Sequence, residues 1–168
     1  MFEVVNKKIN FNNGESKNYK VFRIEPDNDS FDNICSYVED KINKENLYEN
    51  GGTLNYSGLT FHSDVLFIAA IDKIPIGYAS IVTNGDSYYV FQIAIKKEYQ
   101  QKGIGTALMN QVIDMADSDG MEVTANVMDY NTNSKKMFTS LGFEKIGYSS
   151  KGDGFYRFSQ NNKCNRTK

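Results

Sequence analysis

Histidine and cysteine are scarce in this chain of 168 residues: His62 is the single histidine, and Cys35 and Cys164 are the two cysteines. One imidazole cannot build a histidine-based metal centre. Two thiols far apart in the sequence give neither a disulfide framework nor the ligand spacing of a zinc site. We therefore expect no metal.

Long hydrophobic runs and an excess of one charge are absent too. The longest uncharged apolar run, Val65 to Ile71, is far shorter than the ~20 residues that span a bilayer. Charge interrupts the segment Met1 to Phe11 too early for a signal peptide. The formal net charge of −2 gives no general attraction to nucleic acid or anionic membrane. We expect neither of these partners, and a cytoplasmic location.

The composition is that of an ordinary globular domain, with 40% hydrophobic and 24% charged residues. Only two prolines punctuate the chain, and it has no internal repeat or low-complexity linker. We expect a single domain over residues 1–168. Residues 1–18 form a strand and loop extension at its start, and residues 161–168 form a polar tail.

Apolar periodicity and turn residues predict the order of the elements. Strands are expected at residues 2–11, 19–25, 64–72, 76–83, 87–97, 121–127, 143–150 and 155–160. Helices are expected at residues 30–46, between the glycines Gly103 and Gly105 and the cap Gly120, and at residues 131–142, the first capped by Ser30 or Asp29. After the extension the order is β-α-β-β-β-α-β-α-β-β, which predicts an α/β (α+β) fold: a mixed, mostly antiparallel central sheet with helices on both faces. Residues 47–62 fit a short helix or an open loop.

Two glycines, Gly103 and Gly105, stand where a strand gives way to a helix. Leu108, Val112, Met115 and Ala116 predict an apolar stripe on that helix, and Gly120 is placed to end it in a left-handed cap. The first turn of a helix presents unpaired N–H groups, which attract anions. The pattern fits a phosphate cradle, to which Lys102 adds charge, and it also fits a tight turn without a ligand. The Walker and dinucleotide-binding patterns are both absent.

The segment "IAIKKEYQQKGIGTALM" resembles the acetyl-CoA-binding motif of the GCN5-related N-acetyltransferase (GNAT) superfamily. In that motif a glutamine or arginine is followed after two residues by glycine and, one residue later, by glycine or alanine, as at Gln100, Gly103 and Gly105. A second motif follows at the expected distance, in Asn131, Ser134 and "MFTSLGFEKIG". The matched segments cover residues 64–148, about half of the chain.

The resemblance implies acetyl-CoA as the acyl donor. Loop amides then hold its diphosphate at the helix start, main-chain groups of the preceding strand pair with the pantetheine arm, and that strand separates from its neighbour to admit the thioester. An N–H at this opening can polarise the thioester carbonyl. Asn131 either binds the pantetheine or sulfur side, caps its helix, or does both. The implied site residues are Ile93, Ala94, Ile95, Gln100, Gln101, Lys102, Gly103, Ile104, Gly105, Thr106, Asn131 and Ser134.

The sequence departs from the family where catalytic groups are expected. Many members have a tyrosine at the position of Phe138, and its phenol protonates the departing thiolate. Relatives that acetylate ribosomal-protein N-termini have a glutamate at the position of Asn126. The catalytic residues therefore stay unassigned. Tyr130, Tyr148 and Tyr156 can replace the phenol or act as packing aromatics, and His62 can be a base or a surface residue.

We expect an N-acetyltransferase that transfers an acetyl group to a primary amine of a small molecule or peptide, by direct attack in a ternary complex. The alternative is a non-catalytic acyl-CoA-binding sensor, and a structural domain with a vestigial loop is a third possibility. The acceptor would bind the N-terminal half. Acidic residues there either attract a cationic amine or form a solvated helix face: Glu39, Asp40, Glu45 and Glu49. The sequence is compatible with a monomer or a homodimer.

Overall fold

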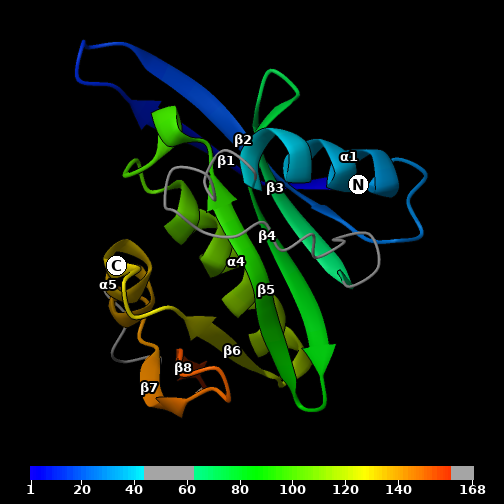
Figure 1. Ribbon diagram of the computed structural model, residues 1–168. Helices are drawn as coiled ribbons and strands as arrows, with labels where there is room; N and C mark the ends of the chain where they lie inside the picture. Colours follow the sequence, from blue (N-terminus) through cyan, green and yellow to red (C-terminus); the bar gives the residue numbers. More distant parts are fainter. Residues whose placement is uncertain (44–62, 160–168) are drawn as a thin grey trace.

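The computed structural model describes residues 1–43 and 63–159 and has one sheet of eight strands (Figure 1). The expectations that concern His62, Glu45, Glu49, Cys164, the stretch 47–62 and the tail lie outside these residues. The strands are β1 (Phe2–Asn10), β2 (Ser16–Ile24), β3 (Val65–Ile71), β4 (Ile74–Asn84), β5 (Ser87–Ile95), β6 (Glu122–Val127), β7 (Glu144–Tyr148) and β8 (Gly154–Phe158). The helices are α1 (Phe31–Val38), α4 (Ile104–Asp119) and α5 (Thr132–Ser140).

The strands lie in the order β1-β2-β3-β4-β5-β6-β8-β7. All neighbours pair antiparallel except β5 and β6, which are parallel. A parallel pair needs a crossover, and α4 supplies it. The mixed, mostly antiparallel sheet expected from the sequence is confirmed.

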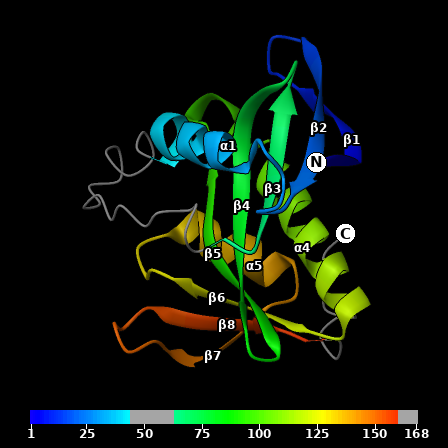
Figure 2. The same cartoon turned by 90° about the vertical axis from the view of Figure 1, so that its right-hand side faces the viewer.

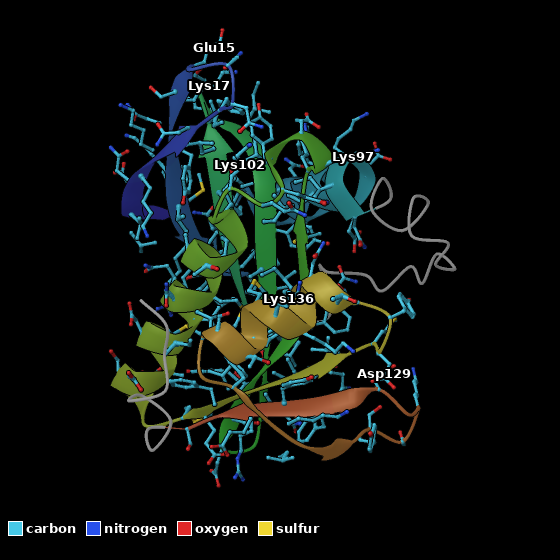
Figure 3. All side chains as sticks on the ribbon, turned by 90° about the vertical axis from the view of Figure 1, so that its left-hand side faces the viewer. Glu15, Lys17, Lys97, Lys102, Asp129 and Lys136 are labelled. Carbon is cyan, nitrogen blue, oxygen red and sulfur yellow. The ribbon has the colours of Figure 1, made fainter. Side chains whose placement is uncertain are left out.

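Helices cover both faces of the sheet. Figure 2 shows α1 in front of the strands, whereas α4 and α5 lie on the side that faces the viewer in Figure 3. The predicted stripe of α4 is buried, with Leu108 and Val112 fully inaccessible, and Gly120 ends the helix with φ of +66°. Both features confirm the prediction from the 3.6-residue period.

The first helix differs in two details from the expectation. Ser30 is its N-cap, but neither its side chain nor that of Asp29 makes a capping hydrogen bond; instead Asn28 Oδ1 accepts from the Ser30 N–H at 2.9 Å. Ser30 thus holds the predicted N-cap position, but without a side-chain capping bond; the side chain that bonds to the backbone here is that of Asn28, in a turn just before the helix. After Val38 the helix continues as a π-helical turn over Glu39–Asn43, which keeps Ile42 buried.

The N-terminal extension is an integral part of the sheet. β1 pairs with β2 from Phe2 opposite Arg23 to Asn10 opposite Ser16, and Ile9 and Tyr19 are buried in the core that α4 covers. The turn between these two strands reaches toward the loop that precedes α4, where Phe11 and Tyr99 stack edge to face with centroids 6.2 Å apart.

Candidate functional site

Strands β5 and β6 diverge after a short parallel ladder. Their last register pair is Val90 with Ala125; beyond it β6 continues only against β8. On its other side β5 has a bulge, because Ser80 pairs with Gln92 and Ile81 with Val90, which leaves Phe91 as the extra residue. Among the described residues, the end of β5 therefore pairs with β4 on one side and with no strand on the other, and we call this unpaired side the opening.

Register shows which residues of β5 face this opening. The Lys96 N–H donates to Ile76 O at 2.8 Å, and in an antiparallel pair successive residues alternate in direction. Ala94, opposite Tyr78, therefore turns its main-chain groups toward β4. Ile93 and Ile95 turn theirs to the side from which β6 has departed.

The loop between β5 and α4 is anchored to the end of β5. A 3-10 turn, Lys97–Tyr99, leads into it, and Gln100 Nε2 donates to Ile95 O at 3.0 Å. Gln100 thus fixes the start of the loop on the strand.

Two residues in left-handed conformation precede α4. Gln101 has φ of +58° and Gly103 of +84°, a sequence that turns consecutive N–H groups to one side. Gly103 is the N-cap, it makes no side-chain capping bond, and the first turn contains no acidic residue. The N-cap residue therefore offers no side chain to the amide groups at the start of α4, and these groups carry the partial positive charge of the helix N-terminus.

The two glycines of the motif have different structural reasons. A Cβ on Gly103 would meet nothing within 4 Å, so that glycine serves the positive φ and leaves open space. A Cβ on Gly105 would lie 3.0 Å from Met137 Sδ of α5. Gly105 therefore lets α5 approach the first turn of α4, a packing role that the sequence did not reveal.

The predicted residues of the second motif lie at the start of α5. Asn131 is the N-cap and accepts from the Ser134 N–H at 3.1 Å, so its capping role is established. Ser134 lies three residues before Met137 and thus on the helix face that approaches α4. The end of β5, the loop, the first turn of α4 and α5 come together, and Figure 3 shows α5 beside α4.

A contact that the sequence did not reveal joins Asn126 to Tyr89 near the point where the strands diverge. Asn126 Nδ2 donates to Tyr89 Oη at 3.1 Å across β6 and β5. Both residues alternate with core residues that pack under α4, so they lie on the opposite face of the sheet, the α1 face. Burial raises the pKa of the Tyr89 phenol, and Asp153 adds to this, while the bond from Asn126 opposes it. Strand alternation is the signal that could have placed Tyr89 there.

Further polar groups lie beside the bulge on the α1 face. Tyr78 Oη donates to Gln92 Oε1 at 2.8 Å, and Asn43 Nδ2 donates to the same oxygen at 3.3 Å. Burial raises the pKa of Tyr78, and the charge of Glu39 contributes, so this phenol stays protonated. The contacts tie the π-helical turn after α1 to β5.

The alternative proton donors are not gathered at this point. Phe138 and Tyr156 are buried and stacked, with centroids 6.3 Å apart. Tyr130 and Tyr148 are each 66% exposed. Of the acidic residues expected near the acceptor, Asp40 pairs with Lys41 at 3.3 Å.

Within residues 1–43 and 63–159 no group of three or more histidine, cysteine or acidic side chains is arranged to hold a metal ion. Among the same residues no helix has the length and hydropathy needed to cross a bilayer.

Comparisons with known proteins identify the family and agree with the fold. The family model described as "Acetyltransferase (GNAT) family" matches residues 30–143. The fold is similar to that of the PaiA N-acetyltransferase from Thermoplasma acidophilum, solved in complex with coenzyme A (TM-score 0.68, 13% identity, covering 84% of this chain and 98% of that one). It is also similar to the GNAT domain of S. lividans PAT (TM-score 0.68, 17% identity, 91% and 96% covered).

A third similar structure is the ribosomal-protein-S18-alanine N-acetyltransferase from Escherichia coli (TM-score 0.56, 18% identity, 83% and 90% covered). At these identities the structures share the fold alone. A comparison with curated proteins finds no match. The family model covers more than half of the chain, and the diverging strands with the open helix start lie within its range: the protein belongs to the acetyltransferase (GNAT) family.

Proposed function

We propose that this protein is an acetyl-CoA-dependent N-acetyltransferase that acts on a primary amine of a small molecule or peptide, by direct attack in a ternary complex. Bound acetyl-CoA supplies an activated acetyl thioester, and transfer to the amine forms an amide and leaves a thiol. The observation that carries the proposal is the start of α4, where the N-cap Gly103 faces open space at the end of the diverging strand β5.

The described residues fit coenzyme A at both ends of this opening. The amides from Gln101 to Thr106 suit a diphosphate, because left-handed Gln101 and Gly103 turn N–H groups outward without a side chain in front of Gly103. Ile93 and Ile95, whose main-chain groups face away from β4, suit the amide-containing pantetheine arm as an added strand. Ser134 and Asn131 would border it from α5. Ala94 would contribute through its side chain rather than its main chain.

The side chains at the positions where the family has its acid and its base, Phe138 and Asn126, can serve neither role. Phe138 has no proton to give and is buried, and Asn126 is not a base. The raised pKa of Tyr89 keeps its phenol protonated at neutral pH, so Tyr89 suits hydrogen bonding to the acceptor and not proton abstraction. The amine would lose its proton to water or to a base outside the described residues. Positioning and polarisation by main-chain N–H groups then carry much of the rate.

The non-catalytic acyl-CoA sensor remains the second candidate, and Phe138 and Asn126 favour it. Turnover separates the two. The purified full chain is mixed with acetyl-CoA, a thiol-reactive dye and a panel of amines, polyamines, aminoglycosides and amino acids. Release of thiol that depends on one amine class supports the enzyme. Heat of acetyl-CoA binding without turnover across the panel supports the sensor, and no heat at all overturns both. A cytoplasmic location and a monomeric or homodimeric state belong to the same proposal.

A further inference from the structure

The N-terminal hairpin brings an aromatic ring to the loop before α4. Two main-chain hydrogen bonds hold Phe11 in the turn. Its N–H donates to Glu15 O at 2.9 Å, and its carbonyl oxygen accepts from the Gly14 N–H at 3.1 Å. Its ring meets Tyr99 edge to face, at 67°. The hairpin thus contacts this part of the chain through the Phe11 ring.

Two lysines from different elements lie over this ring. Lys17 Nζ of β2 is 5.9 Å from the Phe11 centroid, and Lys102 Nζ of the loop is 5.5 Å from it. Figure 3 shows both on the same side of the molecule, above the N-terminal end of α4. Each contact is of cation–π type, which at exposed sites is weak.

Neither lysine of this pair forms an ion pair within the part of the chain that the structure describes. Neither ammonium group has a carboxylate within 4.0 Å there, whereas Lys20 and Lys41 are paired. Two cations held on one ring repel each other, and an anion between them would remove that cost. The neighbouring start of α4 adds positive potential of its own.

We propose that Phe11, Lys17 and Lys102 form a subsite for the 3′-phosphate on the adenosine end of coenzyme A. The inference rests on the proposed function, which puts the diphosphate on the loop that contains Lys102. Coenzyme A carries a second anionic group, the 3′-phosphate, which only the ribose separates from that diphosphate. The hairpin then contributes to donor binding through Lys17, and a ligand that lacks the 3′-phosphate loses this contact.

The test compares coenzyme A with 3′-dephospho-coenzyme A by calorimetry on the full chain, its Lys17→Met variant and its Lys136→Met variant. Methionine keeps the apolar stem and removes the charge. Lys136, an exposed lysine of α5 that Figure 3 shows on the same side, is the matched control. The wild-type chain is expected to bind coenzyme A about three- to tenfold more tightly than the dephospho form. In Lys17→Met the ratio of the two affinities is expected to fall to near one, because coenzyme A binds more weakly while the affinity for the dephospho form stays the same.

The outcomes separate the subsite from the function. If neither ligand binds the wild-type chain, the proposed function fails. If both bind and the ratio is already near one in the wild type, or persists in Lys17→Met, the subsite is refuted while the function stands. A ratio that falls in Lys136→Met and not in Lys17→Met moves the 3′-phosphate to α5 and also refutes it. Circular dichroism of both variants confirms that the fold is kept.

Discussion

Replacement of Gly103 by alanine tests the proposed diphosphate cradle at the position where the structure allows the smallest change. The backbone there has φ of +84°, and a Cβ would meet no atom within 4 Å. The methyl group would therefore enter open space in front of the first turn of α4. The left-handed conformation costs an L-residue about 1–2 kcal/mol, so the variant is less stable but still folds.

The expected loss of affinity follows from what the methyl group would displace. An oxygen of a diphosphate that bonds to main-chain N–H groups makes charge-assisted contacts of ~1.5–3 kcal/mol each. If the methyl group breaks one such contact, the Kd for coenzyme A rises roughly 10- to 150-fold. Calorimetry with coenzyme A measures this directly.

Gly152 supplies the matched control. It has φ of +88° in the turn between β7 and β8, and a Cβ there would also meet nothing within 4 Å. Gly152→Ala therefore carries the same backbone strain away from α4. Urea unfolding of both variants is expected to show similar losses of stability. Wild-type affinity in Gly103→Ala, or an equal loss of affinity in both variants, would refute the cradle.

Three further changes probe other parts of the molecule. Tyr89→Phe is expected to lower kcat/KM for the amine about tenfold while the Kd for coenzyme A stays unchanged; a change in the Kd alone would place Tyr89 on the donor side. Tyr88 donates to Asp119 at 2.6 Å, and this bond raises its pKa to about 12 from 10.0. The folded protein thus holds this proton longer than the unfolded chain, so the stabilisation is complete below pH 10 and is lost between about pH 10 and 12. Tyr88→Phe should flatten the fall of the urea midpoint over that interval, and an unchanged slope would contradict the assignment. Phe138→Tyr puts a hydroxyl into an aromatic cluster and should cost about 1–3 kcal/mol of stability with no gain in turnover; faster turnover at unchanged stability would mean that the phenol reaches the sulfur.

The elements with strong local periodicity could be predicted from the sequence. α4 is the clearest case, since its buried stripe and its glycine cap both depend on residues within one helix. The side-chain cap of α1 could not, because the side chain that bonds to the backbone there is that of Asn28, which accepts from the Ser30 N–H before the helix begins. Local sequence does not tell which of several polar side chains near a helix start will bond to the backbone.

The site residues could be predicted from the sequence only where they lie close together along the chain. The residues of the loop before α4 follow one another in sequence, so the motif located them together. The contact of Asn126 with Tyr89 joins residues 37 positions apart, and it depends on the pairing of β5 with β6. The role of Gly105 depends in the same way on the approach of α5, which no spacing in the sequence reveals.

The short parallel ladder has a mechanical consequence. Within the sheet, the few register pairs from Ser87 with Glu122 to Val90 with Ala125 are all that fastens strands β1–β5 to strands β6, β8 and β7. A small rotation about this seam changes the width of the gap beyond it. A molecule bound in the gap would contact both halves of the sheet, so saturation should slow hydrogen exchange in both halves at once, by up to the ~2.7 kcal/mol that mass action gives at a hundredfold excess over Kd.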